Sequence, residues 1–178
     1  MTRLLSDRIR IVAVIAGVIA ASLTTLAPAH AATYPPAIPI VLKTTVTSSG
    51  TTLNTLPGGI TYGWNDLNGP TTWGKQQAAI HFQGDVNYLN GSGPFNGYVT
   101  VTGADGTVLA FRVEGSALAV PLNSGATETH FAGDIKVIGG TGTYANAKGI
   151  GTMVGTRDAA LGSPVRLTFR LTVLPART

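Results

Sequence analysis

The chain contains no cysteine, so no disulfide can hold its fold and the hydrophobic core must do so alone, which favours a closed, well-packed domain. Charged residues are also scarce. They make up 11% of the chain and form no basic run, which argues against nucleic acid as a partner. Helical periodicity is nearly absent, because apolar residues do not recur at the spacing of an amphipathic helix. These absences favour an all-β protein.

Long hydrophobic runs are also missing, apart from one at 11–26. Three arginines precede this run, and an Ala-His-Ala sequence ends at residue 31. This arrangement is typical of a secretory signal peptide, so we expect residues 1–31 to be removed and the protein to be extracellular. No later stretch approaches the roughly 18 apolar residues of a membrane span, so we expect no membrane association after cleavage. The remaining chain has the length of a single domain.

Short alternating runs, separated by Gly, Asn, Pro and Ser, predict eight strands. The proline-containing residues 32–37 form an extended lead-in, and the β-domain follows over 38–178. Many evenly spaced strands in one small domain indicate a sandwich or a barrel. The predicted strands are 38–47, 59–65, 77–89, 96–103, 107–117, 129–138, 148–156 and 165–174. Between two of them, residues 65–72 are expected to form a loop at a barrel mouth, flanked by Trp64 and Trp73.

Each predicted strand has one apolar and one polar face, which fixes the side that turns inward. The predicted apolar faces contain no Asp, Glu, Lys, Arg or His. Glycines in mid-strand, such as Gly84 and Gly133, indicate a bend, a bulge or close packing under an aromatic ring. The residues expected to face inward are Phe82, Val86, Tyr88, Leu109, Phe111, Ile135, Leu167, Phe169 and Leu171.

One short sequence occurs twice: HFQGDV at 81–86 and HFAGDI at 130–135, each followed at the same distance by a glycine-rich turn. If the two strands were neighbours, His81, Asp85, His130 and Asp134 could form a surface metal site. Alternation instead places all four on outward faces, as solvated side chains of a duplicated scaffold. We favour the scaffold and expect no metal site.

Two segments, VIGGTGTYANAKGIG at 137–151 and PVRLTFRLTVL at 164–174, resemble the C-terminal part of the allene oxide cyclase and dirigent proteins. These families have a glycine-rich turn ending in an aromatic residue, a glycine soon after it, and a final alternating strand. The resemblance implies a calycin-like, eight-stranded antiparallel β-barrel with an apolar interior cavity. The residues that carry the turn motif, with an expected structural role, are Gly139, Gly140, Thr141, Gly142, Tyr144 and Gly149.

Two functions are open at this point. The first is a secreted barrel that binds a small apolar ligand, or serves as a scaffold, without chemistry of its own. The alternative is a cyclase-like or dirigent-like enzyme that guides an apolar substrate in the cavity. We favour the first because the predicted interior lacks ionisable residues, so no catalytic residue is assigned. No cofactor is expected, and homo-oligomerisation is left open. The candidate cavity residues are Phe82, Tyr88, Phe111, Ile135 and Phe169.

Overall fold

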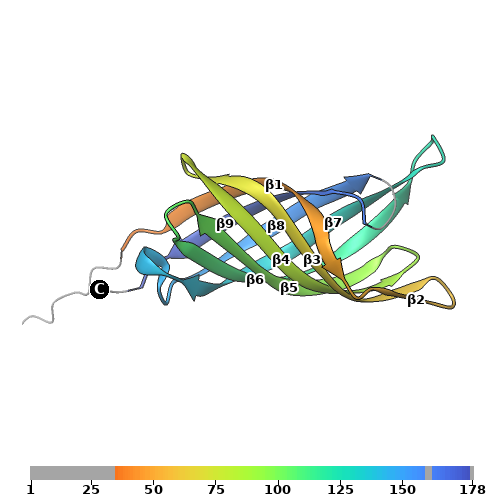
Figure 1. Cartoon of the computed structure of the whole chain (residues 1–178), viewed down its shortest axis with the longest axis horizontal. Helices are drawn as coiled ribbons and strands as arrows, with labels where there is room; N and C mark the ends of the chain where they lie inside the picture. Colours follow the sequence, from red (N-terminus) through yellow and green to blue (C-terminus); the bar gives the residue numbers. More distant parts are fainter. Residues whose placement is uncertain (1–34, 159–161, 177–178) are drawn as a thin grey trace, which may run out of the picture. The chain divides into compact units, whose positions relative to one another are not determined.

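The structure, a computed structural model, describes residues 35–158 and 162–176. The predicted signal peptide and the first part of the lead-in lie outside these residues. The described chain is almost entirely strand (Figure 1). None of its helical segments is long and apolar enough to span a membrane. The elements are β1 (Ile38–Thr51), β2 (Asn54–Leu56), β3 (Ile60–Trp73), β4 (Gln76–Leu89), β5 (Gly93–Gly103), β6 (Val108–Pro121), β7 (Thr127–Gly140), the 3₁₀ helix η1 (Gly142–Tyr144), β8 (Lys148–Asp158) and β9 (Val165–Leu174).

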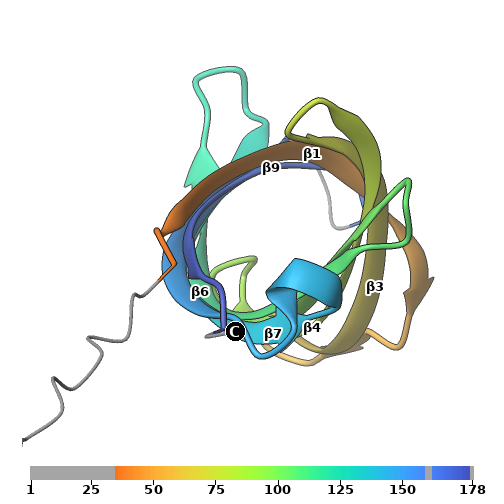
Figure 2. The same cartoon turned by 90° about the vertical axis from the view of Figure 1, so that its left-hand side faces the viewer.

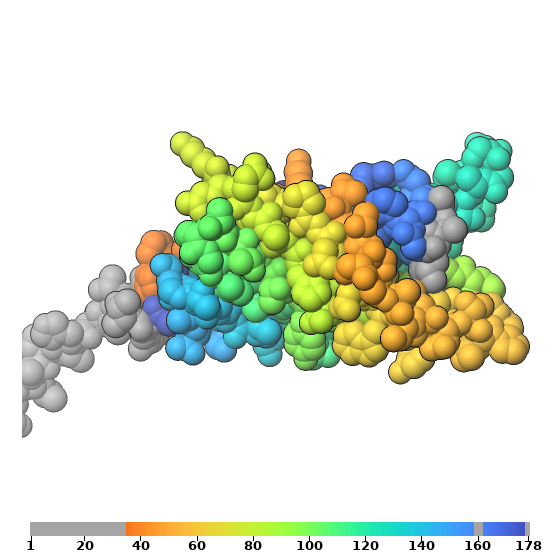
Figure 3. Space-filling view, in the orientation of Figure 1, coloured from red at the N-terminus to blue at the C-terminus, as the bar shows by residue number. Residues whose placement is uncertain are grey.

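The strands close into a barrel, which confirms the predicted eight-stranded antiparallel fold. Consecutive strands from β3 to β9 pair as neighbours, β9 pairs with β1, and β1 pairs with β3 to complete the ring (Figure 2). The short β2 is additional and pairs only with β3. In the face shown in Figure 3, the side chains of β1, β3, β4 and β5 pack into an unbroken wall. Closure joins β1 and β3, the two outer strands of the eight-stranded sheet, which suits a chain without disulfides.

The interior is built by alternation, as the sequence predicts. All five phenylalanines of the chain are buried inside the barrel. Phe111 and Phe169 meet at its centre, edge to face, with ring centroids 5.4 Å apart. Burying each large apolar side chain contributes about 1.5–3 kcal/mol, so a one-residue slip of any strand would be costly. Of the residues expected to face inward, all are buried except Val86, which is half-buried.

Cross-strand pairs of glycine let the aromatic rings lie against the backbone. Gly84 pairs with Gly97 across β4 and β5, and Gly115 pairs with Gly133 across β6 and β7. A Cβ atom on Gly97 would lie 2.3 Å from a backbone oxygen of β4 and 2.7 Å from the ring of Phe82. The predicted close packing under an aromatic ring is present at Gly84, where a Cβ would lie 3.1 Å from the Phe82 ring, whereas the nearest side chain at Gly133 is that of Val113.

The predicted loop at 65–72 is wrong, because β3 runs without interruption through Pro70 to Trp73. Proline is tolerated there because of the direction in which its backbone faces. The carbonyl of Pro70 points toward β1, and an N–H at this residue would point the same way. The ladder between β1 and β3 covers only the stretch from Thr47 to Thr51, so no donor is needed at Pro70. The two tryptophans also separate: Trp73 packs against the core, whereas Trp64 is exposed on the outer surface.

Side-chain hydroxyls replace the missing ladder along the seam between β1 and β3. Thr44 Oγ1 donates to the Pro70 carbonyl over 2.8 Å, and Thr71 Oγ1 donates to the Lys43 carbonyl over 2.9 Å. Both threonines are buried. Gly69 allows the approach, since a Cβ there would lie 2.3 Å from a backbone oxygen of β1. Barrel closure therefore depends on a few polar contacts as well as on the core.

The glycine-rich turn between β7 and β8 lies at the end of the barrel that carries η1, here called the η1 end (Figure 2). Gly139 and Gly142 have φ values of 138° and 54°, which favour glycine. Thr141 Oγ1 accepts a hydrogen bond from the Val108 N–H, and the Tyr144 ring packs on Trp73 with centroids 5.0 Å apart. Of the other motif residues, Gly140 abuts the Val108 carbonyl and Gly149 abuts the Thr172 carbonyl.

Candidate functional site

A cavity of about 50 Å³ lies inside the opposite end of the barrel, where β2 projects and β8 ends. We call this the β2 end (right in Figure 1). Six of the eight barrel strands and the segment before β2 contribute to its wall, so it forms only when the sheet closes. Its lining residues are Leu53, Asn65, Leu67, Phe82, Gly84, Asp85, Val86, Tyr88, Phe95, Phe131, Met153, Arg157, Val165 and Leu167.

The wall of this cavity is mainly aromatic and aliphatic. Phe82, Tyr88, Phe95 and Phe131 are all buried there. Phe95 and Phe131 meet edge to face, with centroids 6.0 Å apart and an interplanar angle of 73°. Such a surface, with a few polar groups among apolar ones, is the usual form of a small-molecule site.

Arg157 is inside the barrel, so the expectation of an interior without ionisable side chains is wrong. It is 7% exposed and is the only charged side chain among the described residues that is buried. Its Cζ lies 5.6 Å from the centroid of the Phe131 ring, within cation–π range. Its Nη2 donates to Thr129 Oγ1 over 3.3 Å, whereas its Nε is buried without a hydrogen-bond partner.

No carboxylate neutralises this guanidinium within the part of the chain that the structure describes. The adjacent Asp158 points to the outer face, where Arg166 binds both of its oxygens over 2.6 and 2.7 Å. Glu128, one residue from Thr129, pairs with His130 over 3.2 Å. Burial lowers the pKa of Arg157 and the nearby Tyr88 opposes this effect, but a guanidinium stays charged at neutral pH.

Tyr88 is a neutral hydrogen-bond donor at this site. Its burial raises the pKa of its hydroxyl well above the ordinary value, an effect that Arg157 reduces and Asp85 increases. The phenol therefore keeps its proton at physiological pH and is a poor general base.

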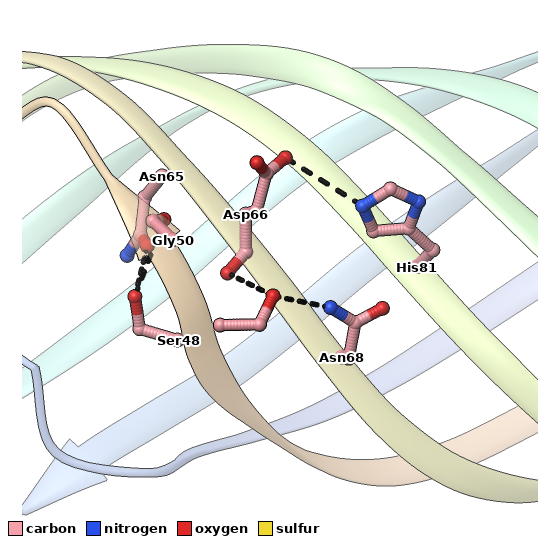
Figure 4. A network of polar contacts seen from close by, with 7 residues as sticks. Ser48, Gly50, Asn65, Asp66, Asn68 and His81 are labelled. Atoms are coloured by element: carbon pink, nitrogen blue, oxygen red, sulfur yellow. Dashed lines mark hydrogen bonds and ion pairs between the residues drawn. The ribbon is translucent and has the colours of Figure 1, made fainter.

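Two further polar residues complete the lining. The amide oxygen of Asn65 accepts a 2.5 Å hydrogen bond from Ser48 Oγ, which leaves the Nδ2 group as the donor toward a ligand. This bond belongs to a polar network along β1, β3 and β4, in which Asp66 also reaches His81 (Figure 4). Asp85, expected to face outward, is half-buried and lines the cavity.

The predicted cavity residues divide into two groups. Phe82 and Tyr88 line the cavity, whereas Phe111, Ile135 and Phe169 belong to the filled middle of the barrel. The sequence did contain a signal for the missed Arg157. Gly149, Gly151, Met153 and Gly155 alternate on the inner face of β8, and the same alternation continues to Arg157. The predicted strand ended at 156 and so excluded it.

The two His/Asp sequences do not form a common site. They lie on β4 and β7, which are separated by β5 and β6. His81 pairs with Asp66 over 3.5 Å and His130 with Glu128, and both histidines are largely solvated. The described residues contain no group of three or more potential metal ligands. The interpretation as outward scaffold positions holds for both histidines and for Asp134, which is exposed.

A second, wider depression of about 590 Å³ lies at the η1 end, near Trp73 and Tyr144. It is lined mostly by strand ends and turns, and no buried ionisable side chain lies there among the described residues. The cavity at the β2 end is therefore the better candidate, because it is less open to solvent and combines aromatic walls with an unpaired charge.

Comparison of the chain with models of known protein families, with proteins of established function and with solved structures found no match. The similarity to allene oxide cyclase and dirigent proteins thus rests on the turn and the final strand alone. The function has to be argued from the cavity itself.

Proposed function

We propose that the protein is a secreted barrel that binds a small, largely apolar ligand in the cavity at the β2 end. The observation that carries this proposal is an aromatic cavity containing the only buried charge of the described chain. A barrel that served only as a scaffold would have no need of an unpaired cation in its interior, where an apolar side chain would be at least as stable.

The cavity volume limits the size of the ligand. A dry apolar cavity of about 150 Å³ is known to hold benzene or xenon, and the cavity here measures about 50 Å³. The ligand is therefore a molecule of few heavy atoms, or a larger one whose end alone enters the barrel.

This size also favours binding over the cyclase-like or dirigent-like alternative. A fatty-acid epoxide or a pair of coupling phenols would need several times the available space. The state of Tyr88 supports the same choice, because a phenol with a raised pKa donates a hydrogen bond but does not accept a proton readily.

Xenon provides a direct test of the cavity, because it is a single apolar atom and needs no polar contact. We expect xenon pressure to shift the methyl resonances of Met153, Val165 and Leu167 in a saturable way in ¹³C-edited NMR spectra. Val86→Phe should abolish these shifts because the larger ring fills the cavity. The matched control is Val41→Phe, the same change at an exposed site on the outer face.

Absence of saturable shifts in the wild-type protein would contradict the proposal and leave the barrel as a scaffold. Unchanged xenon binding in a folded Val86→Phe variant would contradict it as well, because the apolar site would then lie elsewhere.

A further inference from the structure

The chemistry of the cavity identifies the class of ligand, given that the proposed function is correct. Arg157 supplies a fixed positive charge in a wall that is otherwise mainly apolar. A buried charge without a partner is costly, and buried arginines are normally paired with carboxylate or phosphate groups. The structure contains the cation of such a pair but no carboxylate bonded to it within 35–158 and 162–176.

The guanidinium also has unused hydrogen-bonding capacity. It carries five N–H groups in a planar fork. One bond, to Thr129, comes from Nη2, and the Nε–H is buried without an acceptor. Two N–H groups on one edge of a guanidinium match the two oxygens of a carboxylate, the geometry of the strongest arginine pairs. Arg157 therefore resembles one half of a pair whose other half comes from outside the chain.

The neighbouring polar groups are suited to the same kind of ligand. Tyr88 is a protonated phenol and Asn65 has only its amide N–H groups left, so both can donate to a ligand oxygen. Asp85 is the one acidic residue of the lining. Its charge would repel an anion, so the anionic group of a ligand should lie on the Arg157 side of the cavity.

From these observations we infer that the ligand is a small monocarboxylate with an apolar remainder, whose carboxylate binds Arg157 and whose carbon chain lies among Phe82, Phe95 and Phe131. This inference rests on the proposed function and adds the charge of the ligand. A phosphate ester is a poorer fit, because a dianion would bring a second charge into a wall that has one cation and an acidic residue.

The test compares propionate with propionamide, which have the same size and differ in charge. We expect NMR titration of the wild-type protein to give saturable binding of propionate that is at least tenfold tighter than that of propionamide. Across acetate, propionate and butyrate, affinity should rise by about fourfold per added methylene until the cavity is full.

The variants separate the charge from the cavity. Arg157→Gln should weaken propionate binding by roughly tenfold to a hundredfold, the loss expected for a charge-assisted bond, and should leave propionamide and xenon binding within about twofold. Arg170→Gln is the matched control, since it removes an exposed arginine from the outer face of β9 and should change nothing. If Arg157→Gln does not fold, Arg157→Met serves the same purpose.

The two proposals fail in different ways. Equal binding of propionate and propionamide, or full propionate binding by a folded Arg157 variant, would overturn the carboxylate inference and leave the apolar site intact. Loss of propionate binding in Arg170→Gln would overturn it too, because the anion would then bind the outer surface. Absence of binding by xenon and both organic probes would overturn the proposed function together with the inference.

Discussion

Arg157 should lower the stability of the barrel, and this expectation can be tested without any ligand. The perturbation is the double substitution Arg157→Met with Thr129→Val, which replaces both partners of a buried hydrogen bond by apolar groups of similar volume. The single substitution Arg157→Met is less informative, because it would leave the hydroxyl of Thr129, which is 2% exposed, without a partner.

The magnitude follows from the contacts of the guanidinium. The double variant loses one charge-assisted bond, about 1.5–3 kcal/mol, and one cation–π contact with Phe131, about 0.5–2 kcal/mol. It removes a buried Nε without a partner, about 1–3 kcal/mol, and the desolvation of a cation, several kcal/mol. A methionine sulfur near the Phe131 ring restores about 0.3–1.5 kcal/mol. The net change is a stabilisation of about 1–3 kcal/mol, in line with apolar replacement of buried ionic groups.

The assay is equilibrium unfolding in urea, with the m-value checked for constancy between variants. Thermal unfolding should show the same order, with each kcal/mol raising Tm by roughly 2–4 °C for a domain of this size. Arg170→Met, at an exposed site, should stay within about 0.5 kcal/mol of wild type. A double variant less stable than wild type by more than about 1 kcal/mol would refute the reasoning and make Arg157 a structural residue.

Three further predictions concern the glycine pairs, the seam and Tyr88. In urea unfolding, Gly97→Ala should destabilise the barrel by about 3 kcal/mol or more, because its Cβ would meet a backbone oxygen at 2.3 Å. Gly84→Ala, with nearest contacts at 3.1 and 3.2 Å, should cost about 1 kcal/mol, and equal losses in the two variants would be inconsistent with this packing. Thr71→Val should lower the free energy of unfolding by about 1–3 kcal/mol because it leaves the Lys43 carbonyl unsatisfied, whereas Thr45→Val, at an exposed site, should cost little. An unchanged stability of Thr71→Val would show that this hydroxyl does not contribute to barrel closure. Above the ordinary tyrosine pKa of about 10, Tyr88 loses its proton in the unfolded chain but keeps it in the folded barrel, so the free energy of unfolding should fall by up to about 1.4 kcal/mol per pH unit. Tyr88→Phe should reduce that slope between about pH 10 and 11.5, and an identical slope in both proteins would show that the hydroxyl is not buried as described.

The eight-stranded barrel could be predicted because local alternation and global closure agree. In β9, Val165, Leu167, Phe169, Leu171 and Val173 all point inward, and the neighbouring strands repeat that pattern. Burial of one complete face sets the register so strongly that the period-two pattern is sufficient evidence. The missing cysteines and the glycine-rich turns led to the same closed fold.

The second half of β3 could not be predicted by the same means. This stretch contains the typical turn residues Asn68, Gly69 and Pro70. Nothing in the neighbouring sequence shows that the segment lies beside β1 and is not exposed to solvent. Only the closed ring explains them: Gly69 permits close approach, and Pro70 lies where the β1 ladder has ended. Contacts across the seam join residues some 26 positions apart, such as Thr44 and Pro70, beyond the reach of local patterns.

The cavity was only partly predictable. Phe82 and Tyr88 were identified as inward residues, but a cavity is what remains after all side chains have packed, so its position at the β2 end is a property of the whole core. Arg157 is absent from the sequence prediction because the expected strand ends at 156, whereas β8 continues to Asp158. A side chain that breaks the expected pattern in this way is typical of a functional site.

The most direct measurement is a crystal structure of the protein with 2-bromopropionate, in which the anomalous scattering of bromine locates the ligand. The account predicts bromine inside the cavity beside Phe95 and Phe131, and a carboxylate oxygen within about 2.7–3.2 Å of a guanidinium nitrogen of Arg157. Bromine found only on the outer surface, or an Arg157 that turns away from the cavity toward another group of the protein, would contradict it.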